Sequence, residues 1–546
     1  MNGYETIAHI LQIEGVEWIS CFPNNALLEA ASKVGIRPVM FRHERGAVMA
    51  ADGYSRTSGR TRFGVIAVQA GPGVENSMGG ISQAFADNIP VLLLPGATRL
   101  DQLSIRPNFY ALHNYKAVTK HVEIVTKPDQ VSSVMRRAFH ALKSGPAGPV
   151  IVEMPSDICS QAVPEASREY KPPKASKALP AEGDIKDAVR ALLKARKPVI
   201  WSGGGALHSG AAEELTELSE LMQIPVYCTL QGKSSFDERH PLSLGAGSGA
   251  TTLPARRWLD ECDVLFAVGS SLTETPFAQK IPDGKLVIQN TDRIEDINKD
   301  IAVDIGLLGD ARLTLRAVID EIKAQLGEAG RKKEPSGVAA EIAALKEQWL
   351  AEWKPLLESD EVPINTYRVI GDINRTLDRE NSIVTHDAGS PRDTLVPFYT
   401  ATTPFSYVGW GKTTHLGFGL PLIIGAKLAH PDKFCLNFMG DGAFGMSGID
   451  IETSVRAEVP ITTVVLDNGG MATYPGGFPF AREHYGLSRM GGNYARIAEA
   501  MGAVGITVKE PQEIVPALEK AMSLNREGKT VLIDVHTNFE SRRSRF

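Results

Sequence analysis

The sequence predicts an α/β protein built from three doubly wound parallel-sheet domains. Short apolar runs of strand length alternate with helical patterns along the chain, for example GVIAVQ at 64–69 and ITTVVL at 461–466. This alternation is typical of parallel sheets whose two faces are covered by helices. The first and last thirds also share one rhythm of helix, strand, Gly-rich turn, helix and strand. A length of 546 residues fits about three or four domains.

Two linker-like stretches divide the chain. Residues 170–183, YKPPKASKALPAEG, are rich in Pro, Lys and Ala, and residues 327–337, GEAGRKKEPSG, are charged and rich in Gly. Both compositions favour exposed, irregular chain. We therefore expect domains at 1–170, 184–326 and 338–546, each large enough to bury its own core.

The composition argues against several classes of protein. A net charge of −6 gives no basic stripe for nucleic acid. No uninterrupted apolar run reaches the roughly 18 residues that a membrane span needs, and the acidic, amphipathic N-terminus does not resemble a signal peptide. The five cysteines are scattered and lack disulfide or zinc spacing, so we expect a reducing, cytoplasmic compartment.

Two polar turns follow two neighbouring predicted strands near the C-terminus. FCLNFM at 434–439 ends in a Gly-Asp-Gly turn at 440–442, and the strand at 461–466 ends in an Asp-Asn-Gly-Gly turn at 467–470. The 24 residues between these turns are enough for one crossover helix. Because ligands bind where the carboxyl ends of parallel strands meet, we expect the two turns to converge on a ligand.

The residue types in these turns suit a magnesium-bound diphosphate. Asp441 offers a carboxylate oxygen and Asn468 a carbonyl oxygen, and Mg²⁺ is usually held by few protein ligands together with water and phosphate oxygens. The helix after Gly442 would direct free N–H groups toward phosphate. Each turn alone could be ordinary turn chemistry, but their order and spacing favour the ligand site.

The pair of turns resembles the fingerprint of thiamine-diphosphate-dependent enzymes. Family members usually close this motif with two asparagines, whereas this chain has Asp467 before Asn468. The resemblance implies that Mg²⁺ is held by Asp441, Asn468 and the carbonyl of Gly470. It also implies a set of cofactor contacts around these turns, namely Gly440, Gly442, Ala443 and Met471.

Further stretches resemble acetolactate synthases in particular. These are FRHERGAVMAADGYSRTSGR at 41–60, QAGPGVENSMGGISQAFADNIPVLLLPG at 69–96, SGPAGPVIVEMPSDI at 144–158 and THLGFGLPLIIGAKLA at 414–429. The resemblance implies a pyrimidine-binding domain at 1–170, a central domain at 184–326 and a diphosphate-binding domain at 338–546.

The same resemblance assigns roles to single residues. Glu44 matches the carboxylate that activates the aminopyrimidine ring of the cofactor, although in isolation it reads as a surface salt bridge with Arg42 or Arg45. Leu416 matches the bulky side chain beneath the bent cofactor, and it could equally be a core leucine. Further implied cofactor contacts are Gly71, Pro72, Asn76, Gly389 and Ser390. Relatives often have Gln-His after that glycine, where this chain has Ser-Pro, which weakens the assignment of phosphate contacts to this turn.

Five residues are candidates for substrate contacts: Gln69, His113, Tyr474, Ser541 and Arg542. Gln69 stands where many relatives have Thr or Ser, and His113 could be a neutral base or a hydrogen-bonded surface residue. Tyr474 lies in a Pro- and Gly-rich loop, either a lid or a plain surface loop. The basic tail ESRRSRF is of a kind that is usually solvated and disordered, but a Ser and an Arg approach acyl-CoA in oxalyl-CoA decarboxylase-like relatives.

The middle domain raises the question of a bound nucleotide. Its GGGALHSG turn at 203–210 permits phosphate binding, but it lacks the spaced glycines and the following acidic residue of a dinucleotide site. We therefore favour a structural strand–helix turn. Some relatives hold FAD or ADP in this domain, and the sequence supports neither here.

These observations lead to a ranked set of functions. The resemblance implies a thiamine-diphosphate- and Mg²⁺-dependent lyase or carboligase acting on 2-oxo acids, similar to acetolactate synthase. The alternative is a 2-hydroxyacyl-CoA lyase or oxalyl-CoA decarboxylase acting on acyl-CoA thioesters, motivated by the basic tail and by residues 108–115. A flavin oxidase and a non-catalytic relative rank lower. Because the family builds its site between chains, we expect a homodimer or homotetramer with a small-molecule substrate.

Overall fold

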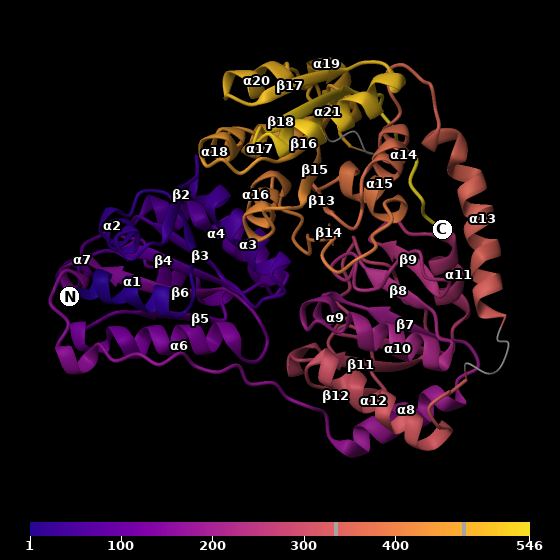
Figure 1. Ribbon diagram of the computed structural model, residues 1–546, viewed down its shortest axis with the longest axis horizontal. Helices are drawn as coiled ribbons and strands as arrows, with labels where there is room; N and C mark the ends of the chain where they lie inside the picture. The colour runs from indigo at the N-terminus through magenta and orange to yellow at the C-terminus, as the bar shows by residue number, and fades with distance from the viewer. Residues whose placement is uncertain (332–336, 472–476) are drawn as a thin grey trace.

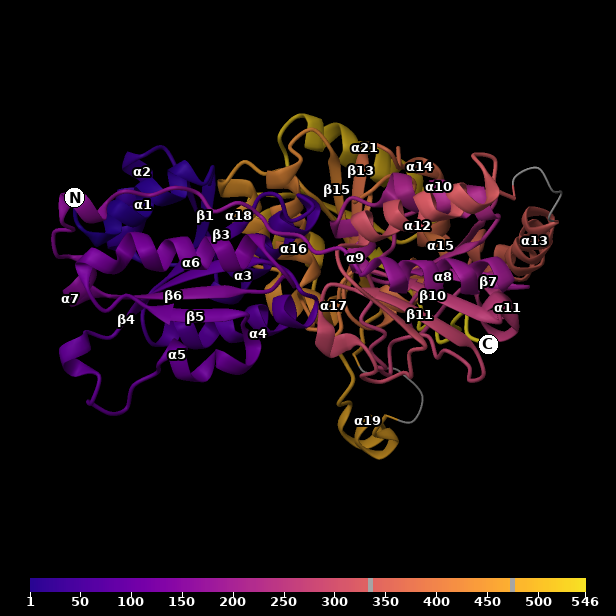
Figure 2. The ribbon, with the colours of Figure 1, turned by 90° about the horizontal axis from the view of Figure 1, so that it is seen from below.

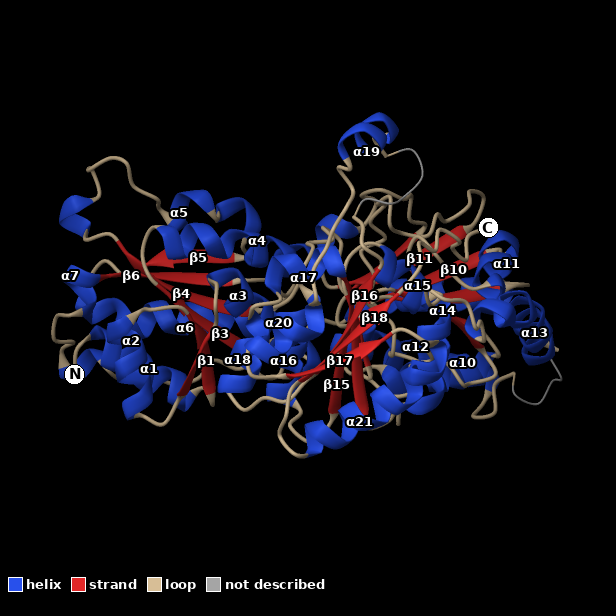
Figure 3. Cartoon of the chain, turned by 90° about the horizontal axis from the view of Figure 1, so that it is seen from above, coloured by secondary structure: helices blue, strands red, loops and turns tan. Residues whose placement is uncertain are grey.

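The computed structural model describes residues 1–331, 337–471 and 477–546 and divides into three domains (Figure 1). Each domain contains one six-stranded sheet, and the paired strands within each sheet run parallel. Seen from above, the strands of each domain lie between helices (Figure 3). The predicted fold class, three doubly wound parallel-sheet domains, is therefore confirmed.

The first domain has the strand order β2-β1-β3-β4-β6-β5. Its strands are β1 (Trp18–Cys21), β2 (Arg37–Met40), β3 (Gly64–Val68), β4 (Val91–Ala97), β5 (His121–Ile124) and β6 (Val150–Pro155). Its helices are α1 (Gly3–Ile13), α2 (Asn25–Lys33), α3 (Glu44–Thr57), α4 (Pro72–Ala86), α5 (Ala111–Asn114), α6 (Val131–Lys143) and α7 (Ser156–Cys159). Every residue of β3 is buried, as expected for a strand covered on both faces.

The central domain has the strand order β12-β11-β10-β7-β8-β9. Its strands are β7 (Pro198–Ser202), β8 (Val226–Thr229), β9 (Ser243–Gly247), β10 (Val264–Val268), β11 (Leu286–Thr291) and β12 (Ile305–Leu308). Its helices are α8 (Glu182–Lys194), α9 (Gly204–His208), α10 (Ala212–Met222), α11 (Leu253–Glu261) and α12 (Ala311–Leu326). The order reverses between β7 and β10, which is where doubly wound sheets bind ligands.

The third domain has the strand order β14-β13-β15-β16-β18-β17. Its strands are β13 (Ser382–His386), β14 (Tyr407–Val408), β15 (Phe434–Gly440), β16 (Thr462–Asp467), β17 (Val504–Val508) and β18 (Val531–His536). Its helices are α13 (Val338–Leu357), α14 (Thr366–Thr376), α15 (Ser390–Phe398), α16 (Gly419–Ala429), α17 (Asp441–Ser447), α18 (Asp450–Arg456), α19 (Pro479–Tyr485), α20 (Tyr494–Ala500) and α21 (Ile514–Arg526). Counted within each domain, the strands follow the same order as in the first domain, in agreement with the shared rhythm in the sequence.

The two predicted linkers differ in how much of them is described. Residues 168–181 contain no helix or strand, and α8 begins at Glu182. Of the second linker, residues 332–336 lie outside the described residues.

Helix α19 projects from the body of the molecule (Figure 2). No helix in the described part of the chain is both long and apolar enough to cross a membrane.

Helices α3 and α16 join the first domain to the third. Nearly every residue of both helices is buried, and two glycines let their backbones touch. A Cβ at Gly53 would lie 2.1 Å from the carbonyl oxygen of Leu422, and a Cβ at Gly425 would lie 1.8 Å from that of Ala50. Only glycine fits at these two positions without moving one helix away from the other.

A buried ion network fastens the same interface. Arg56 on α3 donates to Asp52 at 2.8 Å and to Asp87, which follows α4, at 3.2 Å. Asp87 also accepts the backbone N–H groups of Gly411 at 3.0 Å and Lys412 at 3.1 Å in the third domain. Because each charge has several partners, this network meets the condition under which buried ions are tolerated.

The close helix contact leads to a stability prediction. Gly425→Ala should lower the free energy of unfolding by about 1–3 kcal/mol or more, because the added methyl group overlaps a backbone carbonyl. The measurement is chemical denaturation followed by circular dichroism. The matched control is Gly183→Ala in α8, where the new methyl group meets no described atom within 4 Å and the change should be less than about 1 kcal/mol. Equal effects of the two substitutions would contradict this picture of the interface.

Candidate active site

The two predicted polar turns meet at the carboxyl ends of β15 and β16. These strands are neighbours in register, with Gly440 opposite Leu466, so both turns leave the sheet at the same edge. Asp441 is the first residue of α17, and its Oδ1 accepts the N–H of Gly442 at 2.7 Å. Burial raises the pKa of Asp441 to about 6, opposed by the Gly442 N–H and reinforced by nearby Asp467.

The Asp441 carboxylate has the properties of a metal ligand. Its residue is 3% exposed, and among the described residues its Oδ2 has no hydrogen-bond partner. A buried carboxylate oxygen without a donor is costly, and a cation would satisfy it. Asn468 lies in the facing turn, where its Oδ1 accepts the N–H of Gly470 at 3.0 Å. The oxygens that Asp441, Asn468 and the carbonyl of Gly470 offer are of the kind that suits Mg²⁺.

A neighbouring segment holds the second turn in place. The N–H of Met471 donates to Ser488 at 2.9 Å, and the N–H of Met490 donates to Gly469 at 2.9 Å. Met471 Sδ lies 3.2 Å from the position that a Cβ at Gly442 would take. The absence of a side chain at residue 442 thus lets the two turns close on each other. Ala443, the next residue of α17, is buried.

A third turn lies beside these two. Gly389 has φ +81 and precedes Ser390, the first residue of α15. Pro391 approaches within 3.9 Å of the Cβ position at Gly440, so the 389–391 turn borders the Gly-Asp-Gly turn. This places the predicted contacts Gly389 and Ser390 next to the predicted diphosphate site, even though the residues after the glycine differ from those of relatives.

Asp387 is a structural residue of the site that sequence reasoning missed. Its buried carboxylate accepts the N–H groups of Gly417 and Gly419, both at 2.9 Å, and burial raises its pKa to about 6. It thereby ties the turn that carries Leu416 to the end of β13. The available signal was an aspartate directly after the apolar run SIVTH, which forms the buried strand β13. Leu416 is half-buried and packs at the edge of the core shared by the first and third domains.

Glu44 begins α3 and is 3% exposed. Its Oε2 accepts a hydrogen bond from the Asn76 side chain at 3.0 Å. The alternative of a salt bridge to a neighbouring arginine is not what the structure shows, because Arg42 pairs with Glu452 at 3.6 Å and Arg45 donates to the carbonyl of Met446. Glu44 is thus a buried carboxylate held by an amide.

The predicted residues after β3 gather around Glu44. Gly71 has φ +65 and caps α4, and exposed Pro72 is the first residue of that helix. The Cβ position of Gly73 lies 2.9 Å from Gln69 Cγ and 3.5 Å from Glu44 Oε1. Gln69 and Glu44 therefore flank the same glycine at the carboxyl end of β3.

Two other substrate candidates lie apart from this cluster or cannot be placed. His113 is exposed on α5, and its ring lies edge-on to Tyr110 at 5.8 Å. No hydrogen bond joins His113 to Glu44 or Gln69 in the described part of the chain. Tyr474 lies outside the described residues.

The C-terminal tail is docked on the protein, which corrects the expectation of a solvated segment (Figure 1). Ser544 is buried, exchanges backbone and side-chain hydrogen bonds with Thr251 of the central domain, and accepts from Trp349 at 2.9 Å. Ser541 and Arg542 are exposed, and Arg542 pairs with Glu352 on α13.

Arg543, which the sequence analysis did not single out, is the tail residue that contacts the Gly389 turn. Its guanidinium donates to Ser390 Oγ and to the carbonyl of Glu540 at 2.8 Å. The local sequence carried no signal for this contact, because it depends on where the tail docks.

A cavity of about 750 Å³ lies where the central domain faces the first and third domains. It is lined by the glycine turns after β7 and β10 and by residues that include Arg60 and Lys412. Burial lowers the pKa of Arg60 to about 10, and its Nε has no hydrogen-bond partner among the described residues. The GGGALHSG turn is therefore a strand–helix turn, as expected, and it also lines a cavity at the point where the strand order reverses.

Comparison with known proteins agrees with this arrangement. Three models of thiamine pyrophosphate enzymes match the chain, the N-terminal TPP binding domain at 1–124, the central domain at 185–318 and the C-terminal TPP binding domain at 387–535.

Relatives are similar over nearly the whole chain. A protein of Methanocaldococcus jannaschii named "Probable acetolactate synthase large subunit" is 30% identical over 96% of this chain and 90% of its own length. The acetolactate synthase isozyme 3 large subunit of Escherichia coli is 29% identical over 98% of this chain and 94% of its own. From the three domain matches and this full-length similarity, we conclude that the chain belongs to the thiamine-diphosphate-dependent enzymes, in the superfamily of acetolactate synthase.

Proposed function

We propose that the protein is an acetolactate-synthase-like carboligase that uses thiamine diphosphate and Mg²⁺ to join two 2-oxo acids with release of CO₂. The observation that carries the proposal is the buried Asp441 carboxylate, whose unpartnered oxygen lies beside the Asn468 turn. The names of the full-length relatives support the choice of reaction. They do not favour acyl-CoA chemistry, and the contact of Arg542 with Glu352 directs that side chain to α13.

Thiamine diphosphate, when bound, supplies the electron sink for breaking and forming a bond next to a carbonyl carbon. Asp441, Asn468 and the Gly470 carbonyl would hold the metal ion that binds with the cofactor. Glu44 would hold the pyrimidine ring and share a proton with it, while Asn76 positions Glu44 through the 3.0 Å hydrogen bond. Leu416 would pack against the bound cofactor, and Gln69 would border the space for substrate.

Two further proposals concern the oligomeric state and the cellular location of the protein. We propose a homodimer or a dimer of dimers, because each complete site takes the Glu44 face of one subunit and the Asp441 face of another. All five cysteines are unpaired and buried, which supports a reducing, cytoplasmic location.

The central cavity supports a second proposal, a bound nucleotide such as FAD or ADP. Gly203 and Gly269 line the cavity at the ends of β7 and β10, and Arg60 and Lys412 line it with positive charge that could face phosphates. A ligand at the reversal of strand order follows the general rule for such sheets.

The proposed reaction can be tested with the purified protein. With thiamine diphosphate and Mg²⁺ it should convert pyruvate to acetolactate, measured as acetoin after acid treatment. Glu44→Gln should lower the rate by about 100-fold or more, because a positioned proton-transfer group contributes that much. Glu29→Gln, on the exposed face of α2, should leave the rate unchanged. Formyl-CoA or aldehyde release from acyl-CoA substrates, without acetolactate, would reverse the order of the two candidate activities.

The shared site can be tested by mixing two inactive variants. Glu44→Gln and Asp441→Asn should each be inactive alone, because each removes one half of every site. After joint refolding, mixed dimers contain one intact site, so roughly a quarter of the wild-type rate should return with random pairing in a symmetric dimer. Light scattering gives the oligomeric state of the same samples. No recovered activity in verified mixed dimers would place the whole site within one chain.

The nucleotide proposal predicts a ligand that copurifies with the protein. Heat-released supernatant should contain either a flavin, seen by its yellow colour and fluorescence, or an adenine nucleotide, seen by chromatography. Arg60→Gln should lower the nucleotide content several-fold, while Arg239→Gln, in an exposed surface ion pair, should not. Protein that contains no nucleotide and gains no thermal stability from added FAD or ADP would exclude this ligand class.

A further inference from the structure

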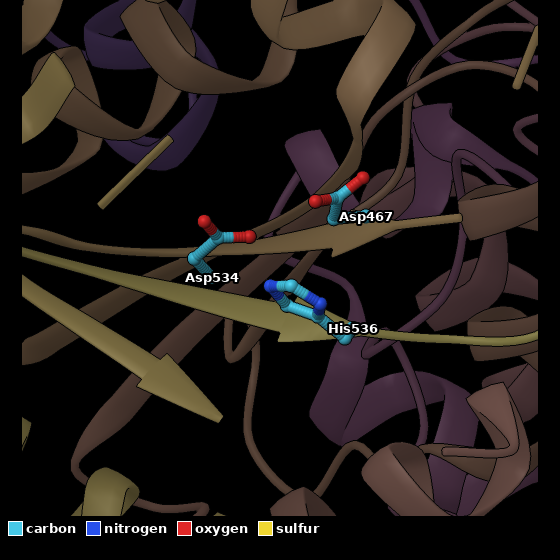
Figure 4. A group of neighbouring side chains, drawn as sticks. All are labelled: Asp467, Asp534 and His536. Atoms are coloured by element: carbon cyan, nitrogen blue, oxygen red, sulfur yellow. The ribbon is translucent and has the colours of Figure 1, made fainter. Parts of the chain in front are cut away.

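Three potential metal ligands gather on one face of the third sheet, beside the proposed magnesium site. Asp467 ends β16, and Asp534 and His536 lie on neighbouring β18 (Figure 4). The register pairs Asp467 with His536 and Val465 with Asp534. Because side chains two residues apart point to the same face of a strand, all three project to one side of the sheet, as the figure shows.

We propose that Asp467, Asp534 and His536 form a second divalent-cation site, separate from the one at Asp441 and Asn468. One ligand atom from each residue lies within 4.8 Å of the others. No hydrogen bond or ion pair joins these three side chains within the described residues. Ligands of a bound ion stand about 2.0–2.2 Å from it, so small side-chain rotations would bring the three atoms around one cation.

The burial and the hydrogen bonding of Asp534 are independent evidence for a ligand. This residue is 1% exposed, and its Oδ2 accepts the N–H groups of Tyr494 at 3.1 Å and Ala495 at 3.2 Å at the start of α20. Its Oδ1 has no hydrogen-bond partner among the described residues. Figure 4 shows a carboxylate oxygen of Asp534 directed toward Asp467 and His536. The hydrogen bonds to the start of α20 thus satisfy one oxygen of this buried carboxylate. The other oxygen has no donor, and a cation would stabilise it.

The charge of the region favours a second cation. Asp467 lies close enough to Asp441 and to Asp534 for its charge to raise the pKa of each of these carboxyl groups. The first residue of the Asp467-Asn468 pair is usually an uncharged amide in the family, so this chain carries an additional negative charge there. One Mg²⁺, which must also balance a diphosphate, cannot neutralise all of these groups. A second cation would do so and would tie the ends of β16 and β18 together.

The donor set selects the type of ion. Mg²⁺ is bound by oxygen ligands, whereas one imidazole nitrogen with two carboxylates suits a first-row transition ion such as Zn²⁺, Co²⁺ or Mn²⁺. His536 offers a ring nitrogen, which is a common ligand of such ions. Three protein ligands leave at least one coordination position for water, so the site would exchange its ion more readily than a closed structural site.

Cobalt provides a direct test, because its visible absorption reports a bound nitrogen and oxygen ligand set. The experiment uses the full chain saturated with Mg²⁺ and thiamine diphosphate, titrated with CoCl₂. We expect one additional Co²⁺ per chain, measured by absorption and by metal analysis after gel filtration, and competition by ZnCl₂. Asp467→Asn and His536→Gln should each weaken Co²⁺ binding by at least the 10–100-fold that loss of a supporting residue around a metal costs.

Control variants separate the two sites. Asp467→Asn keeps the side-chain volume and restores the amide usual in the family, so it should retain Mg²⁺-dependent cofactor binding. Asp441→Asn should lose that binding and still bind Co²⁺ at the second site. His113→Gln, at an exposed histidine far from this cluster in the sequence, should change neither. The proposal is overturned if the wild-type holoenzyme binds no additional Co²⁺, or if folded Asp467→Asn and His536→Gln proteins bind it as tightly as the wild type.

Discussion

The contact between α3 and α16 is the constraint on which the rest of the structure depends. Gly53 and Gly425 bring the two backbones so close that no side chain fits between them. Helix α3 begins with Glu44, and α16 begins three residues after Leu416. The same packing therefore fixes the positions of Glu44 in one domain and of Leu416, the proposed cofactor support, in the other. The Asp52–Arg56–Asp87 network fastens the rim of this interface by satisfying backbone N–H groups of the loop before α16.

The two halves of the site are built in the same way on two sheets of the same strand order. In each domain a buried carboxylate lies at the carboxyl edge of a parallel sheet, close to a glycine turn that keeps side chains out of the way. Asp441 is buried beside the 469–471 turn, and Glu44 is held by Asn76. Both carboxylates are removed from bulk water, so a ligand that neutralises or hydrogen-bonds them gains more than it would at the surface.

The third domain connects the parts of the molecule. It shares one apolar core with the first domain and another with the central domain. Its C-terminal tail returns to the central domain, where Ser544 and Thr251 form hydrogen bonds with each other, and Arg543 of the tail contacts Ser390 beside the Gly-Asp-Gly turn. The central cavity touches all three domains. A ligand in that cavity would contact the loop that carries Lys412. The backbone N–H of Lys412 donates to Asp87, which belongs to the ion network at the α3–α16 interface.

Glu44 became a candidate only through the resemblance to the family. The sequence by itself determined the fold class, the pairing of the Gly-Asp-Gly and Asp-Asn-Gly-Gly turns, and the candidates Asp441 and Asn468. These features are local, because alternating strands and helices with glycine at strand ends follow from backbone preferences within short stretches. Tertiary structure alone decided that Asn76 holds Glu44, that Asp387 anchors the Leu416 turn, and that the tail is docked.

It also decided that Asp467 stands opposite His536 and near Asp534. Each of these contacts joins residues far apart in the chain, and no local pattern encodes which strands become neighbours or in what register. The immediate sequence could therefore suggest which residues are candidates for the site, whereas their partners required the folded chain.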